Sequence, residues 1–398
     1  MSTPRSSALP GLVTLAAMSL AFILANSPFR PLFELLHHLP VALQIGTVTA
    51  ARPLILWVND GLMAFFFLLI GLELKREVLE GHLSTTGARA GPALAATGGI
   101  VVPAAVYLAV NTANGAAAAG WAIPAATDIV LVVTLLTLAG PRIPPSVRVF
   151  VTALATLDDL AAIGVIAFYY AADLSGAAIG LAAGIALVLV VLNRAGIKSA
   201  AAYAVTGGLL WIALSRSGVH ATLAGVLVGF AVPLRSPRSM GGRSPLRTME
   251  NRLRPWVNYG VVPVFAFLNS GIPVDLDTLV GVLTPVSMGI VLGLFAGKQV
   301  GIFGACWLAA RAGLARLPEG ASWRHIYGVA VLSGVGFTMS IFIAGLAFDQ
   351  PEAFLQARVS VILGSLLSAV AGLAFLRVAV PHPSGSDQHL HGPREASR

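Results

Sequence analysis

Charged residues are scarce in this chain. Asp, Glu, Lys and Arg together make up 11% of its 398 residues, whereas hydrophobic residues make up 57%. The mean hydropathy of +0.84 is far higher than a globular domain with a hydrated surface allows. A water-soluble protein is therefore excluded, and the solvent around most of the chain must be lipid.

Cysteine is almost absent as well. The single residue of this type, Cys306, lies in an apolar stretch, so we exclude a disulfide framework or cysteine-ligated metal site and interpret it as a packing residue. The formal net charge is +8, but no basic block is interleaved with aromatic residues, so no nucleic-acid partner is expected. No nucleotide-binding loop is present, and no cofactor is expected.

Long apolar runs, in contrast, are abundant. Only helices and closed barrels satisfy the backbone inside a bilayer, and these runs are continuous rather than alternating, which predicts helices. Counting the stretches that can cross roughly 30 Å of hydrocarbon gives twelve transmembrane helices. We expect one all-α domain over residues 11–380, between a cytoplasmic N-terminus (1–10) and a disordered cytoplasmic tail (381–398). The predicted spans are 11–28, 60–80, 91–110, 121–139, 146–171, 177–193, 200–214, 218–233, 256–271, 285–310, 326–348 and 355–378.

Positive charges are distributed unequally among the predicted loops. With the N-terminus in the cytoplasm, twenty of the 25 Lys and Arg residues fall on the inner side. This pattern predicts an inner-membrane protein with both termini in the cytoplasm. On the outer side, residues 44–56 (QIGTVTAARPLIL) are rich in β-formers around a polar centre and are interpreted as a periplasmic β-hairpin. The positive residues assigned to the outer side are Arg30, Arg52, Arg216 and Arg358.

Four charged residues fall near the centres of predicted spans: Asp128, Asp158, Asp159 and Lys298. Each costs roughly 2.5–3.5 kcal/mol at that depth even on the most permissive scale, so each needs a reason. Asp158 follows the cytoplasmic Arg148 by ten residues, about 15 Å along a helix and half the hydrocarbon thickness. Lys298 is equally central in its span. We therefore expect these charges at mid-bilayer.

A structural ion pair would explain one buried acid but not two consecutive ones. Neighbours on a helix point about 100° apart, so one lysine on a facing helix cannot neutralise both. A site with one additional carboxylate can take up a proton or a metal ion. Asp158 and Asp159 are thus the candidate site for protons and a small cation, with Lys298 as the charge partner.

Two predicted spans contain residues that interrupt a helix. The fourth reads WAIPAATDIVLVV, where Thr127 and Asp128 follow Pro124, and the eleventh reads VLSGVGFTMSIF, with Gly334 and Gly336. A tolerated kink is one explanation. The other is a pair of interrupted helices that cross at mid-bilayer, as in transporter sites. In that arrangement Asp128 would offset the positive helix ends and Lys298 the negative ones.

Several segments are highly specific when taken together: FFFLLIGLELKREVLEG, GWAIPAATDI, ALATLDDLAAI, SGVHATLAGVLVGF, PVFAFLNSG, GLFAGKQVGI, LPEG and SGVGFTMSIFIAGLAF. They resemble the NhaA family of sodium/proton antiporters, over nearly the whole chain. The resemblance implies inverted repeats formed by spans three to five and ten to twelve, and a homodimer joined through periplasmic hairpins. It also implies that Asp159 is the main ligand of Na⁺ or Li⁺ and Asp158 the second acid, with Thr127 and Asp128 at the fourth-span break.

The resemblance further implies activation at alkaline pH through a charged cluster at the cytoplasmic mouth. Taken alone, residues 73–77 are a solvated helix end with an ion pair, and the histidine at position 220 is an interfacial residue. Two positions that are histidine in the best-known family member are Asn251 and Arg254 here, so the pH response can differ. The residues that correspond to the cluster are Glu73, Lys75, Arg76, Glu77, His220 and Glu250.

The sequence therefore predicts a secondary transporter rather than an enzyme: an electrogenic antiporter that expels Na⁺ or Li⁺ in exchange for entering H⁺. An intramembrane aspartyl protease would need its two acids on facing helices, and a retinal protein would need an aromatic cage around Lys298. Neither condition fits. The same fold exchanging K⁺ or an organic anion stays open, because the size of an ion site is invisible in a sequence. An unrelated proton-coupled transporter is the remaining alternative.

Overall fold

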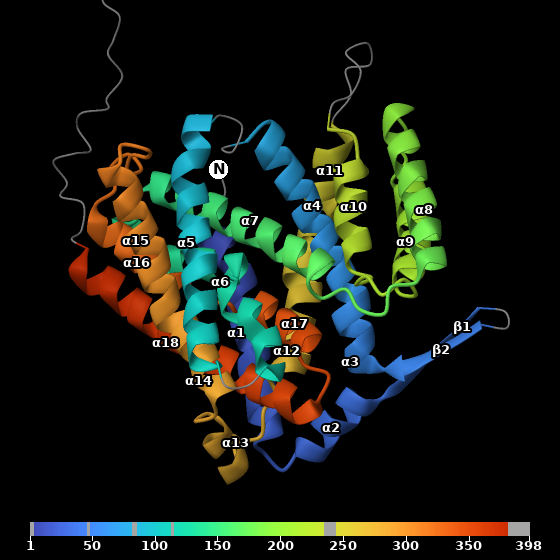
Figure 1. Ribbon diagram of the computed structural model, residues 1–398, viewed down its shortest axis with the longest axis horizontal. Helices are drawn as coiled ribbons and strands as arrows, with labels where there is room; N and C mark the ends of the chain where they lie inside the picture. Colours follow the sequence, from blue (N-terminus) through green and yellow to red (C-terminus); the bar gives the residue numbers. More distant parts are fainter. Residues whose placement is uncertain (1–3, 46–47, 82–85, 113–114, 235–243, 381–398) are drawn as a thin grey trace, which may run out of the picture.

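The computed structural model describes residues 4–45, 48–81, 86–112, 115–234 and 244–380. These form a bundle of helices with one two-stranded sheet projecting from it (Figure 1). The predicted tail, 381–398, lies outside the described residues. Helix α1 begins at Pro4, so most of the N-terminal segment predicted over residues 1–10 is part of the first helix. Proline fits there because the first turn of a helix leaves its backbone N–H groups unpaired anyway.

Each of the twelve predicted spans contains helix. Three stretches are continuous helices that pass through a short π-helical segment: α3–η1–α4, α11–η5–α12 and α14–η6–α15. The elements are α1 Pro4–Ala25, α2 Arg30–His38, α3 Leu54–Leu56, η1 Trp57–Leu62, α4 Met63–Leu79, α5 Thr86–Val110, η2 Ala116–Ala125, α6 Ile129–Leu138, η3 Gly140–Arg142, α7 Pro145–Phe168, α8 Gly176–Arg194 and α9 Ala200–Leu214. They continue with α10 Leu223–Ala231, α11 Pro245–Trp256, η5 Val257–Val261, α12 Val262–Ser270, α13 Leu276–Gly281, α14 Pro285–Leu292, η6 Gly293–Gly297, α15 Lys298–Arg311, α16 Trp323–Leu332, α17 Phe337–Ala347 and α18 Pro351–Ala379.

Length and composition qualify eight of the described helical stretches to cross a membrane, and the bent pair α16 and α17 would be a ninth. Helix α9 is apolar but shorter than the others. The protein is thus a mostly helical, multi-pass membrane protein, as predicted. The count of twelve spans stays a prediction, because three predicted spans do not qualify: α9, α10 and the stretch from α11 to α12.

Two predicted boundaries are wrong, for local reasons. The span predicted at 218–233 is helical only from Leu223, because Gly218 has a φ of +83° and lies against the Ala172 carbonyl, where a side chain would clash. The span predicted at 256–271 belongs to a helix that starts at Pro245. That first part is polar but amphipathic, and it buries Leu246 and Glu250.

The β-hairpin pairs β1 (Pro40–Ile45) with β2 (Val48–Pro53) in antiparallel register, Pro40 opposite Pro53. The hairpin starts four residues before the start of the predicted segment 44–56, and it ends three residues before the end of that segment. Prolines bound it at both ends because they cannot donate a ladder hydrogen bond. The indole of Trp57 donates to the Val41 carbonyl at 3.0 Å and ties the hairpin to η1.

Small residues let the central helices approach closely, as is usual where lipid removes the hydrophobic drive for association. A side-chain carbon at Gly98 of α5 would meet the Gly301 carbonyl of α15, and one at Gly301 would meet the Gly98 carbonyl. On α10, a carbon at Gly225 would meet the Ala64 carbonyl of α4. The α5–α15 contact lies one turn from Lys298 and sets the depth of that side chain in the bundle.

Candidate functional site

Two helix interruptions lie against each other inside the bundle. Between η2 and α6, Ala126 and Asp128 have extended backbone, and between α16 and α17 the helix axes bend by 43°. The Asp128 N–H donates to the Val335 carbonyl at 2.7 Å, so each interruption supplies a partner for the other. This satisfies backbone groups that the helix ends leave open.

The predicted helix breakers are located at these interruptions. A side-chain carbon at Gly334 would meet the Leu294 carbonyl, and one at Gly336 would lie 2.8 Å from the Ala126 carbonyl. Both glycines therefore allow a close backbone approach that any larger residue would prevent. Pro124, near the end of η2, packs on Gly293 of η6.

Asp128 is bound between two helix N-termini. One carboxylate oxygen accepts from the Leu131 N–H at 3.1 Å, which caps α6. The other accepts from the N–H and the hydroxyl of Thr338, at 3.1 and 2.7 Å, in the first turn of α17. A negative charge is favourable where two sets of N–H groups converge. Thr338 was missed by the sequence analysis; the signal was a threonine directly following the glycine pair and a phenylalanine.

Lys298 contacts the first of these interruptions, between η2 and α6. Its Nζ donates to Asp158 Oδ2 at 2.8 Å, to the Thr127 hydroxyl at 2.9 Å and to the Ala125 carbonyl at 2.5 Å. All three ammonium hydrogens thus have acceptors. The Thr127 hydroxyl lies 2.7 Å from Asp158 Oδ2 and 3.0 Å from the Ser333 carbonyl, and its single hydrogen serves one of them at a time. Lys298 and Asp158 are completely enclosed, with side chains 0% and 1% exposed.

Asp158 and Asp159 are both buried in α7 but have different surroundings. Asp158 faces Lys298 and Thr127, while its Oδ1 has no partner among the described residues. Asp159 lines a cavity of about 500 Å³ between α4, α6, α7 and the α11–η5 junction. Thr156 and Thr152 line the same cavity, one and two turns earlier on α7. The paired acids thus divide into one held in the packed core and one open to a space large enough for water.

The far part of this cavity is lined by Glu73, Arg76, Glu77 and Arg254, and Glu250 pairs with both arginines. These five residues are called the charged cluster here. Arg76 pairs with Glu250 at 3.0 Å and with Glu77 at 2.8 Å. Arg254 pairs with Glu73 at 3.1 Å and also contacts Glu250. Of these residues, Arg254 was noted in the sequence only as a departure from the family pattern.

Two residues predicted to join the cluster have other contacts. The Lys75 ammonium donates to the Phe230 and Val232 carbonyls at 2.7 Å each, capping the C-terminus of α10. His220 has its Nε2 at 3.8 Å from Asp60 Oδ1 and its Nδ1 at 2.7 Å from the Thr222 hydroxyl. Its ring meets Phe342 edge-on.

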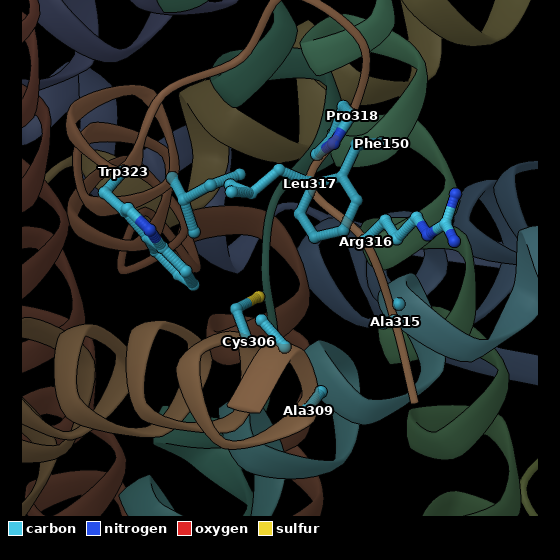
Figure 2. A pocket seen from close by; sticks show the side chains of 11 residues that line it. Phe150, Cys306, Ala309, Ala315, Arg316, Leu317, Pro318 and Trp323 are labelled. Carbon is cyan, nitrogen blue, oxygen red and sulfur yellow. The ribbon is translucent and has the colours of Figure 1, made fainter. Parts of the chain in front are cut away.

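Cys306 lines a separate pocket of about 20 Å³, with Phe150 of α7 and Trp323 of α16 (Figure 2). The loop 315–318 closes it, and Arg316 is the one charged residue in its lining. No acid lines this pocket. The contacts of Cys306 fit the packing role that its apolar sequence neighbours predicted.

The helices and the charges enclosed among them define a multi-pass α-helical membrane protein with a buried ion-pair network. Residues 2–376 match the family model described as Na⁺/H⁺ antiporter 1. The chain is 48% identical to the Na⁺/H⁺ antiporter NhaA of Rhodospirillum rubrum, over 94% of this chain and 96% of that protein. It is 47% identical to NhaA 2 of Magnetococcus marinus (94% and 95%) and 48% identical to NhaA 1 of Pseudomonas putida (93% of each).

The chain therefore belongs to the NhaA family of Na⁺/H⁺ antiporters. This confirms the resemblance found in the sequence segments. The relatives are named as transporters, which fits the prediction of a transporter rather than an enzyme.

Proposed function

We propose that this protein expels Na⁺ or Li⁺ across the bacterial inner membrane in exchange for entering H⁺, and that Asp158 and Asp159 are the exchange site. The supporting observation is the unequal environment of the two acids. Lys298 neutralises Asp158, whereas Asp159 opens to the 500 Å³ cavity and forms no salt bridge in the described part of the chain. One negative charge is left over, and a proton or a small metal ion can balance it.

The atoms available suit a hard cation. Carboxylate oxygens are ligands that small, hard cations prefer, and Asp158 Oδ1 is a buried acceptor with no partner in the described part of the chain. In the proposed cycle, protons leave through the cavity as the cation enters. If two protons exchange for one Na⁺, one net charge moves per cycle and the membrane potential drives export.

The two interrupted helices are proposed to be spans four and eleven of a twelve-span protein with inverted repeats, crossing at mid-bilayer. Asp128 lies at the N-termini of α6 and α17, and Lys298 binds the carbonyl that ends η2. These contacts involve the ends of η2, α6 and α17, and the Thr127 contact with the Ser333 carbonyl adds the end of α16. Transporter sites form where such half-helix ends meet. Both termini are proposed to face the cytoplasm, so that the charged cluster forms the cytoplasmic mouth of the cavity.

Alkaline activation is proposed to act through this cluster. Its five members form a connected set of ion pairs, and Glu73, Arg76, Glu77 and Arg254 line the same cavity as Asp159. His220 and Lys75 lie outside it and are assigned at most an indirect role. The hairpin is proposed to join two copies of the chain, since it projects away from the bundle (Figure 1).

Transport by everted membrane vesicles tests the proposal directly. Na⁺ and Li⁺ added to vesicles with an acidic interior are expected to dissipate the pH gradient, and K⁺ to have little effect. Dissipation by K⁺ alone would support the alternative substrate. A response to none of the three cations, from correctly inserted protein across pH 6.5–9, would contradict antiport. Current recorded on solid-supported membranes separates electrogenic from electroneutral exchange.

A further inference from the structure

A slot of about 340 Å³ lies between α4, α9 and α10, on the side of the bundle where α8 and α9 form the edge in Figure 1. Phe65, 50% exposed, lines it, so the slot opens on the lipid-facing surface. Its walls consist largely of small residues. These are Gly61, Ala64, Ala204, Gly207, Gly208 and Gly225.

Aromatic side chains close the two ends of the slot. Trp57 and Trp211 stack with ring centroids 6.4 Å apart, and both indole N–H groups are satisfied, by the carbonyls of Val41 and Asp60 respectively. Tyr203 lies eight residues before Trp211 on α9, about 12 Å away along the axis. The slot is therefore long, narrow and apolar except at the tyrosine.

The Tyr203 hydroxyl is a buried polar group that the described residues leave unsatisfied. The side chain is 1% exposed, and its hydroxyl has no hydrogen-bond partner in the described part of the chain. Such a group costs roughly 1–3 kcal/mol of stability unless an acceptor forms a hydrogen bond with it. A ligand of this slot should therefore present one acceptor at the tyrosine and hydrocarbon elsewhere.

The slot also has room that the protein does not fill. A side-chain carbon at Gly208 or Gly61 would meet no atom within 4 Å, although both residues line the slot. Glycine in a helix interior costs about 0.5–1 kcal/mol relative to alanine, and no close protein contact explains it at these two positions. A ligand bound in the slot would explain both glycines.

The position of Tyr203 in the helix pair indicates which lipid atom is the acceptor. Tyr203 lies in the first turn of α9, next to the α8–α9 loop, where the exposed Arg194 ends α8 and the exposed Lys198 follows in the loop. This end of the helix pair is polar, and tyrosine favours the boundary between head groups and hydrocarbon. Phospholipid ester carbonyls lie at that boundary, and the acyl chain continues inward, toward Trp57 and Trp211.

We propose that the slot binds one acyl chain of a bilayer phospholipid, with its ester carbonyl accepting a hydrogen bond from Tyr203. The proposal does not depend on the exchange site, which lies on other helices. Binding would fill the space between α9 and α4, and would hold the outer pair α8–α9 against the helix that carries Glu73 and Arg76.

Native mass spectrometry of the full-length protein in detergent tests this with two probes. These are dioleoyl phosphatidylglycerol and its diether analogue, which lacks the ester carbonyls. The wild type is expected to bind the diester about fivefold more tightly, the equivalent of one neutral hydrogen bond. Tyr203→Phe should bind both probes equally, at the level of the diether. Gly208→Leu should fill the slot and lose binding of both.

Gly184→Leu is the matched control, because Gly184 of α8 also meets open space but does not line the slot. It should bind both probes as the wild type does. Size-exclusion chromatography confirms that each variant is folded, and Gly208→Ala, a smaller change, replaces Gly208→Leu if the latter aggregates. Unchanged lipid binding in the folded Gly208 variant would overturn the proposal. The same diester preference in the wild type and Tyr203→Phe would overturn the assigned carbonyl contact.

Discussion

The ion pair of Lys298 with Asp158 and the charged cluster around Arg76 differ in how far water reaches them. The first pair is enclosed, with side chains 0% and 1% exposed. In the cluster, Arg76 is 27% and Arg254 44% exposed, although their shared partner Glu250 is only 4% exposed. One group is held in a packed core, and the other lines a cavity.

Because of this difference in exposure, removing a charge should affect stability differently in the two groups. An enclosed pair whose partner is removed leaves an uncompensated charge, which is strongly destabilising. The cluster is redundant: Arg76 also contacts Glu77, and Arg254 also contacts Glu73. Exposed pairs are individually worth little, because water and salt screen them. The core network should therefore control folding and exchange, and the cluster should adjust exchange without supporting the fold.

The largest effect is expected from Asp159→Asn. The change removes the carboxylate that opens to the cavity but none of the contacts of Lys298, so exchange should fall to background while the protein stays folded. Everted vesicles give the rate and a thermal melt gives the stability. Asp173→Asn is the control: this exposed residue has a φ of +50°, which asparagine tolerates. Wild-type rate and cation affinity in Asp159→Asn would contradict the proposed site.

Lys298→Gln should have the largest effect on stability. It leaves the Asp158 charge buried without its partner, at a cost of about 3–5 kcal/mol, seen as a lower melting temperature. Arg311→Gln, on the same helix but stacked on Trp307 at the surface, should cost less than about 1 kcal/mol. Equal melting temperatures for the two variants would show that the enclosed pair is not the stabilising element.

Lys298→Arg separates a structural lysine from a proton carrier. Arginine keeps the charge, but its planar fork cannot match three acceptors arranged around one ammonium, so stability should fall between the wild type and Lys298→Gln. Arginine does not deprotonate. Persisting current on solid-supported membranes would therefore support the structural role, and loss of current in folded protein would assign proton transfer to Lys298.

Glu250→Gln addresses the cluster and should shift the pH dependence rather than the stability. It removes the negative charge that Arg76 and Arg254 share, so these two cavity-lining arginines become less neutralised, which favours proton release from Asp159. The pH of half-maximal exchange should move down by less than about one unit, because the two arginines are partly exposed and screened and a screened charge contributes at most about 1 kcal/mol. Glu80→Gln makes the same charge change outside the cavity, where Glu80 pairs with Arg247, and should leave the profile unchanged. Equal shifts of the pH profile in Glu250→Gln and Glu80→Gln would exclude a specific role for the cluster.

The sequence predicted the helices well, because long apolar runs have few alternatives in lipid. It also singled out four charged residues that the structure buries, and the residues at the two breaks between helices. It could not decide which aspartate faces Lys298, since that depends on the rotation of α7 and adjacent positions differ by about 100°. The sequence grouped His220 with Glu250, because a resemblance between sequences gives no distance between two residues; in the structure His220 contacts Asp60 and Thr222 instead. Thr338 was missed because its role depends on the contact of α17 with Asp128.

The smallest expected effect concerns His37 of α2, a partly buried group outside the spans that has no ion pair among the described residues. Burial lowers the pKa of His37 below 6.5, although its hydrogen bond to the Leu268 carbonyl opposes the shift; Arg358 and His38 lower it further. The unfolded chain therefore binds more protons than the folded one just below pH 6.5, so stability is full above that pH and falls on acidification. The melting temperature should drop more between pH 7.5 and 5.5 in the wild type than in His37→Gln, whose amide can still donate to Leu268. The exposed neighbour His38, changed to glutamine, should leave the drop unchanged. An identical drop in His37→Gln would mean that another group causes the acid sensitivity, and that burial without a charge partner has no measurable effect at this end of the bundle.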